Sequence, residues 1–258
     1  MNDVFGATYA GLYNLLYSDK DYGAECDLID RLFQRYGNKS VSSVVDFGCG
    51  TGNHAFPLSQ RGYDVVGVER SENMLALARQ RLAAAHPNTS RIAFHQADIR
   101  NAQIGRTFDS ALMMFAVLGY QIENDDVLST LKTARAHLRA GGLLIFDVWY
   151  GPAVLHQKPS DRVKVTRSEN ESVLRVASGE LDISRHRCLV RFHLWRLAGE
   201  RVLAETEETH TMRFFFPQEL HLLLGCSGFT LIRLGAFPDF DADPTETTWN
   251  VLGVALAV

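Results

Sequence analysis

A glycine-rich segment, VVDFGCGTGNH at residues 44–54, has the residue types and spacing of a ligand-binding turn. Its apolar start predicts a buried strand, and the glycines after it would let a ligand approach the backbone where a helix begins. Asp46 precedes the first glycine by two residues, and a carboxylate there would repel a pyrophosphate and attract a cation. Asn53 occupies the position where a dinucleotide fingerprint, G-x-G-x-x-G, has its last glycine. The segment therefore favours a cationic ligand over a dinucleotide.

Two further acidic residues follow the next two predicted strands. Glu69 ends the second strand, where a carboxylate can accept hydrogen bonds from both hydroxyls of a ribose. Asp98 follows the third strand, where it could accept a hydrogen bond from an adenine amino group, with Met74 and Ile99 covering the faces of the ring. Three acids after three successive strands favour S-adenosylmethionine, which carries an ammonium and a sulfonium and has no phosphate.

The elements that must position these residues alternate between strand and helix through the first 150 residues. Short apolar runs predict parallel strands, and apolar residues at helical spacing predict the helices between them. Strands are expected over 41–47, 63–69, 91–95, 108–115 and 143–148; helices are expected over 24–36, from 53, from 71, and from 125 to the pair Gly141-Gly142. This alternation predicts an α/β fold with a doubly wound parallel sheet.

The pattern changes after Gly151, where alternating residues over 162–216 predict antiparallel strands, with 188–195 and 205–215 as the clearest. A helix over 217–226 and strands over 230–236 and 248–258 complete the chain. The predicted organisation is a ligand-binding domain made of residues 1–150 and 217–258. Residues 151–216 would form an antiparallel β insert that acts as a lid over the substrate.

Composition and charge limit the possible partners. Hydrophobic residues at 46% and charged residues at 22% are typical of a soluble globular protein. The net charge of −4 weighs against a nucleic-acid partner. Neither the four cysteines nor the nine histidines have metal-ligand spacing, so no metal is expected. The first residues do not form a signal peptide, and no apolar run approaches the ~20 residues of a membrane span. We therefore expect a cytoplasmic protein without a membrane partner.

Residues 46–52, Glu69 and Asp98 together resemble the cofactor motifs of class I S-adenosylmethionine-dependent methyltransferases, over about the first 150 residues and the closing strands. The resemblance implies a Rossmann-like, seven-stranded sheet with a final antiparallel strand. It also implies S-adenosyl-L-methionine as cofactor and S-adenosyl-L-homocysteine as product. The implied cofactor site consists of Tyr9, Asp46, Gly48, Cys49, Gly50, Asn53, Glu69, Arg70, Met74, Asp98, Ile99 and Met114.

A narrower resemblance concerns two other segments. Residues 9–22, with their tyrosines, are similar to the N-terminal segment of small-molecule methyltransferases, and EETHTMRFF at 207–215 resembles a stretch of sugar N-methyltransferases of deoxyaminosugar pathways. Those enzymes methylate nucleotide-linked amino sugars, so the resemblance implies the amine of such a sugar as the acceptor. One departure is Tyr120, which stands where those enzymes tend to hold a histidine.

Six residues are candidates for contact with the acceptor, and each has a structural alternative. The candidate catalytic residues are Tyr120 and His210; the candidate substrate-binding residues are Tyr22, Trp149, Tyr150 and Arg213. A lone histidine is usually a hydrogen-bonded structural residue, and the aromatic residues could equally pack a helix face or the hinge to the insert. A charged residue on a sheet is usually only solvated.

Two other functions stay open on sequence alone. The chain could methylate the oxygen or nitrogen of another small metabolite, or bind the cofactor without turnover. The insert also provides edge strands that could pair across a homodimer.

Overall fold

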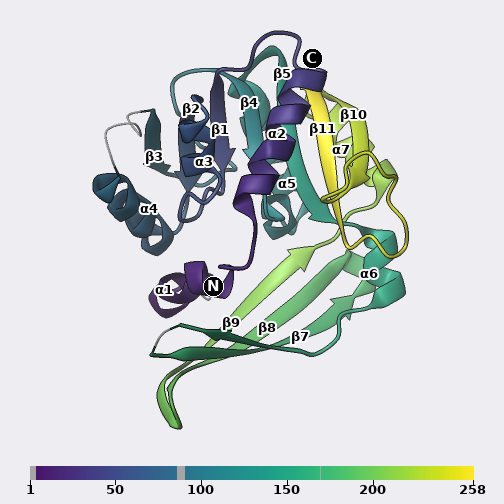
Figure 1. Cartoon of the computed structure of the whole chain (residues 1–258). Helices are drawn as coiled ribbons and strands as arrows, with labels where there is room; N and C mark the ends of the chain where they lie inside the picture. Colours follow the sequence, from purple (N-terminus) through teal and green to yellow (C-terminus); the bar gives the residue numbers. More distant parts are fainter. Residues whose placement is uncertain (1–3, 86–90, 169) are drawn as a thin grey trace.

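Two β-sheets make up the molecule in the computed structural model, which describes residues 4–85, 91–168 and 170–258. A seven-stranded sheet has the order β10-β11-β5-β4-β1-β2-β3, and a four-stranded sheet has the order β6-β7-β8-β9. The smaller sheet lies beyond the carboxyl ends of the parallel strands, and the first helix lies between the two sheets (Figure 1).

The seven-stranded sheet has the topology predicted from the alternation of strands and helices. Its parallel strands are β1 (Ser43–Phe47), β2 (Asp64–Glu69), β3 (Ile92–Gln96), β4 (Phe108–Met113) and β5 (Leu138–Trp149). Strand β11 (Asn250–Ala257) runs antiparallel to both of its neighbours, β5 and β10 (Phe229–Ala236). The predicted doubly wound sheet with a final antiparallel strand is thus confirmed.

Helices cover both faces of this sheet. The helical elements are α1 (Ala7–Leu16), α2 (Tyr22–Tyr36), α3 (Ala55–Gln60), α4 (Glu72–Ala84), η2 (Val117–Tyr120), α5 (Asn124–Ala136), α6 (Gly151–Gln157), η3 (Ile183–Arg185) and α7 (Pro217–Gly225). Helices α5 and α7 pack on one face with Val45 and Phe47, whereas α2 and α3 pack on the other face with Val44. Adjacent residues of β1 therefore enter opposite cores, which is why the strand is continuously apolar.

The boundary between α5 and β5 differs from the sequence prediction. Helix α5 ends at Ala136, and β5 already begins at Leu138, so Gly141-Gly142 lies within the strand instead of ending the helix. His137 explains the early stop, because its Nδ1–H donates to the Thr133 carbonyl at 2.8 Å and its Nε2 accepts from the Ile104 backbone N–H at 3.1 Å. These two bonds hold the chain at the point where it leaves the helix.

The four-stranded sheet corresponds to the predicted insert. Its strands are β6 (Arg162–Arg167), β7 (Ser172–Asp182), β8 (Arg187–Ala198) and β9 (Arg201–Arg213), and the short helix α6, which the sequence analysis did not predict, leads into it. The chain leaves and re-enters the larger sheet at one neck, where Phe215 N–H donates to Trp149 O at 3.0 Å and Gly151 N–H donates to Phe215 O at 2.8 Å. The insert is therefore attached through two adjacent chain segments.

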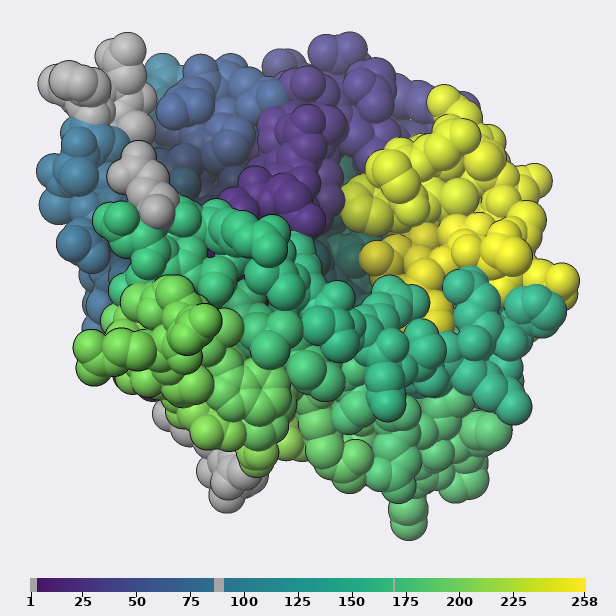
Figure 2. Space-filling view, turned by 60° about the horizontal axis from the view of Figure 1, so that its bottom comes forward, coloured from purple at the N-terminus to yellow at the C-terminus, as the bar shows by residue number. Residues whose placement is uncertain are grey.

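One face of the insert packs against α1. Val173 of β7 and Leu194 of β8 join Tyr9, Tyr13 and Leu16 in a buried cluster. In the space-filling view the surface is hollowed where the N-terminal segment (purple), the C-terminal segment (yellow) and the insert (green) meet (Figure 2). Within the described residues, no helix has the length and apolarity of a membrane span.

Candidate active site

The loop after β1 is shaped by glycines at the carboxyl end of the parallel strands. Gly48 has φ +72°, and a Cβ there would lie 2.6 Å from Val117 Cγ2, so only glycine fits. The backbone N–H groups of Gly48 and Cys49 both donate to the Val68 carbonyl, at 2.7 and 3.1 Å. The loop is thereby fixed against the end of β2, which brings it to Glu69.

Glu69 braces this loop. Its Oε2 accepts from Gly50 N–H at 3.0 Å, and its Oε1 accepts from Ser71 N–H at 2.7 Å. Burial raises the pKa of the carboxyl. Each oxygen retains a second lone pair, so the side chain can accept two further hydrogen bonds from a bound diol.

Asp46 is a buried carboxylate that forms no ion pair with the residues that the structure describes. Its side chain is 2% exposed, and Oδ2 has no hydrogen-bond partner among the described residues. Burial raises its pKa to about 6; nearby His54 lowers it and Glu69 raises it further. Because a buried, uncompensated carboxylate is unfavourable, a cationic ligand beside Asp46 would stabilise the ionised form.

Asp98 makes a contact that the sequence analysis missed. Arg100 donates to it from Nε at 3.0 Å and from Nη2 at 2.6 Å, and this pairing lowers the pKa of the carboxyl. The same guanidinium also reaches Asp126 at 2.8 Å. Asp98 is therefore held ionised at the end of β3, and an adenine amino group would have to share its oxygens with Arg100.

The remaining predicted cofactor residues lie at the loop, in the core and, for Arg70, on the surface. Met74 lies against the glycine loop, because its Cε would be 3.3 Å from a Cβ built at Gly50. Cys49 is buried, and burial raises the pKa of its thiol, as expected of a packing residue. Ile99 packs in the core with α5, Met114 packs in the core with α2, and Arg70 is exposed.

Helix α1 covers the glycine loop. Asn14 Oδ1 accepts from Thr51 Oγ1 at 2.7 Å and from Asn53 Nδ2 at 3.3 Å, so one side chain ties the helix to the loop. Tyr9 is 1% exposed, and its hydroxyl lies 3.3 Å from the hydroxyl of Tyr17. The role of Asn14 was not predicted, because an asparagine within a tyrosine-rich helix has no distinctive spacing.

The structure brings the two candidate catalytic residues together. Tyr120 Oη, at the end of η2, lies 2.9 Å from Nδ1 of His210 on β9. Burial raises the pKa of Tyr120, so its phenol keeps its proton at neutral pH. The rings of Phe5, Tyr9 and Phe192 surround the imidazole at centroid distances of 5.3, 5.5 and 5.2 Å. This pair joins the parallel sheet to the insert.

The loop that leads to Tyr120 depends on another residue that the sequence analysis missed. Asp147, buried in β5, accepts from the backbone N–H groups of Phe115 and Ala116. Both of these residues have left-handed φ values, 71° and 55°. Burial raises the pKa of Asp147 to about 6. Because Asp147 lies inside an apolar run, nothing in its spacing indicates this function.

Three of the candidate substrate-binding residues are aromatic. Trp149 contacts Trp249 at a centroid distance of 5.4 Å, and Tyr150 packs against the main core beside the neck. The Tyr22 ring meets His54 edge-on at 5.1 Å; burial raises the pKa of Tyr22 to about 12. Its hydroxyl has no hydrogen-bond partner among the described side chains and main chain.

Arg213 has a different environment from the one expected of a substrate-binding residue. The side chain is buried, and its guanidinium donates to Glu219, to Asn124 Oδ1 at 2.7 Å and to the Ile122 carbonyl at 3.2 Å. Its charge is matched inside the fold, which favours a structural role. The predicted role in substrate binding has no support from this geometry.

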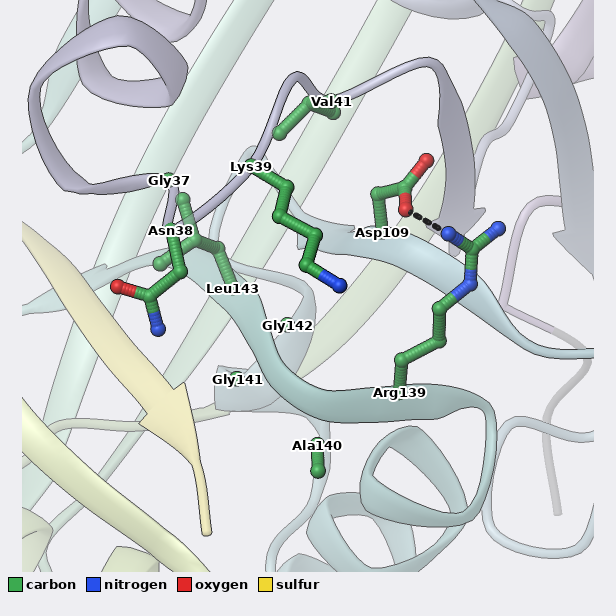
Figure 3. A pocket seen from close by; sticks show the side chains of 10 residues that line it. All are labelled: Gly37, Asn38, Lys39, Val41, Asp109, Arg139, Ala140, Gly141, Gly142 and Leu143. Atoms are coloured by element: carbon green, nitrogen blue, oxygen red, sulfur yellow. Dashed lines mark ion pairs between the residues drawn. The ribbon is translucent and has the colours of Figure 1, made fainter.

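A pocket at the opposite end of the sheet contains none of the predicted site residues. It is lined by Gly37, Asn38, Lys39, Val41, Asp109, Arg139, Ala140, Gly141, Gly142 and Leu143 (Figure 3). Its charged side chains include the Arg139–Asp109 ion pair. Over residues 4–85, 91–168 and 170–258, no group of three or more His, Cys, Asp and Glu side chains could hold a metal ion. The candidate site is therefore at the carboxyl ends of the strands.

Comparison with known proteins shows what kind of domain carries these residues. Residues 44–142 match the family model of a methyltransferase domain. The chain is 32% identical over 152 residues to dTDP-3-amino-3,4,6-trideoxy-α-D-glucopyranose N,N-dimethyltransferase of Streptomyces venezuelae, covering 58% of this chain and 60% of that protein. It is 25% identical over 230 residues to dTDP-3-amino-3,6-dideoxy-α-D-glucopyranose N,N-dimethyltransferase of Streptomyces fradiae, covering 88% and 86%. The first alignment thus spans less than two thirds of either protein.

The fold also matches solved structures. The sugar N-methyltransferase KedS8 from Streptoalloteichus sp. ATCC 53650 superposes with a TM-score of 0.80 at 22% identity, covering 98% of this chain and 95% of that one. At this identity the match establishes the fold. The resemblance that residues 46–52, Glu69 and Asp98 indicated is confirmed by the family model and by the two relatives.

Proposed function

We propose that this chain, with its methyltransferase domain over residues 44–142, transfers a methyl group from S-adenosylmethionine to the amine of a nucleotide-linked amino sugar. The observation that carries the proposal is the buried, unmatched carboxylate of Asp46 beside the loop that Glu69 braces. A cationic ligand with a ribose suits this pair. The acceptor class rests on the two relatives, whose names describe N,N-dimethylation of dTDP-linked amino sugars.

The cofactor would be held by residues of β1, β2 and α4 and of the loop after β3. Asp46 would face its ammonium, Glu69 would accept from both ribose hydroxyls, and Asp98 would accept from the adenine amino group. Met74, which lies against the glycine loop, would contact the adenine ring. Helix α1, tied to the loop through Asn14, would close the site from above.

S-adenosylmethionine would supply a methyl group on a sulfonium, already activated for in-line displacement. The chain's main contribution is to hold the acceptor nitrogen close to that carbon, which is worth on the order of 7–11 kcal/mol. An acceptor amine must lose its proton before its lone pair can form the new N–C bond. As the C–S bond breaks, its electron pair stays on sulfur, and the products are the methylated amine and S-adenosylhomocysteine.

Tyr120 and His210 can remove that proton. Tyr120 Oη would take the proton from the acceptor ammonium while its own proton passes to His210 Nδ1, 2.9 Å away. General-base assistance of this kind contributes roughly 10²–10⁴-fold. We expect Tyr120→Phe and His210→Ala to lower turnover moderately, with cofactor affinity retained.

The acceptor would enter through the hollow seen in Figure 2, between the insert and the C-terminal segment. Residues 151–216 would then wall the acceptor site and serve as its lid, with Trp149, Tyr150 and Tyr22 as candidate contacts. The edge strands of the insert predict a homodimer, and light scattering in solution would test this prediction.

Mass spectrometry provides the decisive test. The protein is incubated with S-adenosylmethionine and a panel of dTDP-linked amino sugars, and an Asp46→Asn variant is the matched control. The expected result is a sugar heavier by one or two methyl groups, with S-adenosylhomocysteine released and much less product from the variant. Protein that binds S-adenosylhomocysteine but methylates none of the sugars contradicts the proposed acceptor. That outcome would favour another small acceptor or a binding role.

A further inference from the structure

We propose that Glu208 is a positioning residue that holds α1 over the cofactor site and sets the tautomer of His210. The meaning of this role for catalysis rests on the proposed function. The contacts of Glu208 do not depend on that function, because they join three parts of the chain whatever the acceptor is. These parts are the segment before α1, strand β9 and the end of η2.

The first observation is that Glu208 caps α1. The helix has Gly6 at its N-cap, no side-chain cap of its own and no acidic residue in its first turn. Glu208 Oε2 accepts from Phe5 N–H at 3.1 Å, and its Oε1 accepts from Gly6 N–H at 3.0 Å. A carboxylate at this end of a helix satisfies free N–H groups and is favoured by the helix dipole. The cap comes from a strand some two hundred residues away in sequence.

The second observation is that the same carboxylate faces His210. Glu208 Oε2 lies 3.5 Å from His210 Nε2, and the two side chains are 7% and 2% exposed. A carboxylate can only accept, so the imidazole is favoured with its proton on Nε2. Nδ1 is then free to accept the Tyr120 hydroxyl proton at 2.9 Å. The other groups around the ring are Phe5, Tyr9 and Phe192, and none of them competes for Nε2.

These two contacts share one side chain, so closure of α1 and the state of the Tyr120–His210 pair are linked. When α1 is in place, the N–H groups of Phe5 and Gly6 at its start hold the carboxylate where it faces Nε2. If α1 opens, Glu208 loses two of its donors and is no longer held there. Glu208 would thus keep His210 in the tautomer that accepts the Tyr120 proton when α1 covers the cofactor site.

The test compares two substitutions on neighbouring residues of β9. Glu208→Gln keeps the shape of the side chain and removes its charge; the amide can also donate to Nε2, which would move the imidazole proton to Nδ1. Glu207→Gln removes the same charge from a side chain that is 76% exposed and pairs with His193. Any general effect of net charge appears in both variants.

Nitrogen-15 NMR of histidine-labelled protein reads the tautomer without any substrate, and the His210 signals are assigned by their loss in His210→Asn. We expect Nε2–H in the unmodified protein and in Glu207→Gln, and loss of that preference in Glu208→Gln. An unchanged His210 tautomer in Glu208→Gln overturns the proposal. Failure of the sugar assay leaves this measurement intact, so the two proposals fail independently.

Hydrogen exchange tests the other part of the proposal, that Glu208 holds α1 in place. Loss of charge-assisted bonds to Phe5 and Gly6 is expected to speed exchange of the α1 amides roughly tenfold in Glu208→Gln, with no change in Glu207→Gln. Glu208→Asp keeps the charge but shortens the side chain by one methylene. This variant provides the test if Glu208→Gln does not fold. It should also expose α1; α1 exchange unchanged in either Glu208 variant contradicts the proposal.

Discussion

Three carboxylates give the candidate site its charge. Asp46 lies near the end of β1, Glu69 ends β2 and Asp98 follows β3. Their surroundings differ: Oδ2 of Asp46 has no hydrogen-bond partner among the described residues, Glu69 is held by backbone donors, and Asp98 is paired with Arg100. The three side chains should therefore respond differently to substitution and to pH.

Glu69→Ala is expected to weaken S-adenosylhomocysteine binding by roughly 10–100-fold or more, because hydrogen bonds to a charged group are worth ~1.5–3 kcal/mol each. The substitution removes the acceptor for the ribose and also frees Gly50 N–H, so the loop loses its brace. Isothermal titration measures the affinity. Glu72→Ala is the control, since Glu72 is exposed and pairs with Arg79. Equal affinity in the two variants would contradict the proposed role of Glu69 in binding the ribose.

The pKa of Asp46, about 6, predicts a pH-dependent affinity. A cation bound beside Asp46 favours its ionised form. Below about pH 6 the free protein holds a proton there that binding must expel, so affinity falls by up to about tenfold per pH unit and levels off above pH 6. Isothermal titration of S-adenosylhomocysteine between about pH 5 and pH 7.5 should show this fall. Asp46→Asn should bind weakly with a flatter profile; a wild-type affinity independent of pH would contradict the role of Asp46.

Sequence alone could locate Asp46, Glu69 and Asp98, because each lies at or just beyond the end of an apolar strand and parallel strands end at a common edge. It could not locate Asn14 or Glu208. Their partners are far along the chain, and their own neighbours look like those of any helix or strand. The partners of Arg213 were equally hidden, since the spacing of β9 does not show that Glu219 and Asn124 lie beside it.

At the scale of elements, the turn after β4 is held by a strand beside it. Phe115 and Ala116 adopt left-handed conformations that L-residues avoid, at a cost of ~1–2 kcal/mol each, and the carboxylate of Asp147 accepts both of their N–H groups. The turn leads directly into η2, so its shape sets where Tyr120 lies. Asp147 therefore acts on the site through the backbone.

Asp147→Ala is expected to lower the free energy of unfolding by about 2–4 kcal/mol, because two N–H groups lose their acceptor. Adding Ala116→Gly should restore about 1 kcal/mol, since glycine adopts φ 55° without strain. Urea denaturation of the wild type, both single variants and the double variant completes the cycle. If the double variant is no more stable than Asp147→Ala, Asp147 does not offset backbone strain at Ala116.

Element types were predictable because their apolar periods are strong, but the end of α5 was not. The pair Gly141-Gly142 is a clear stop signal, yet the helix ends earlier because His137 bonds to both Thr133 and Ile104. The contact with Ile104 crosses from one element to another. Local pattern therefore predicted the alternation of strands and helices in the larger sheet but missed α6 and misplaced the end of α5.

At the scale of the whole molecule, α1 lies between the two sheets, so the bound cofactor should order parts that are distant in sequence. We expect S-adenosylhomocysteine at about 100 times its Kd to slow hydrogen exchange in α1, in the loop over 48–53 and in η2, by up to about 100-fold. Helix α7 and strand β10, at the far edge of the sheet, are the internal control and should not change. Protection confined to the loop would show that α1 does not close over the cofactor.

The narrow neck has a consequence for how such proteins can diversify. The insert departs at Gly151 and returns at Phe215, and adjacent backbone bonds hold the two points together. A segment whose ends meet can be lengthened, shortened or exchanged without shifting the register of the sheet that carries it. The insert, which we propose walls the acceptor site, would thus be a module that can be exchanged. New acceptors could be acquired by swapping it, provided that the replacement keeps a carboxylate where Glu208 meets α1.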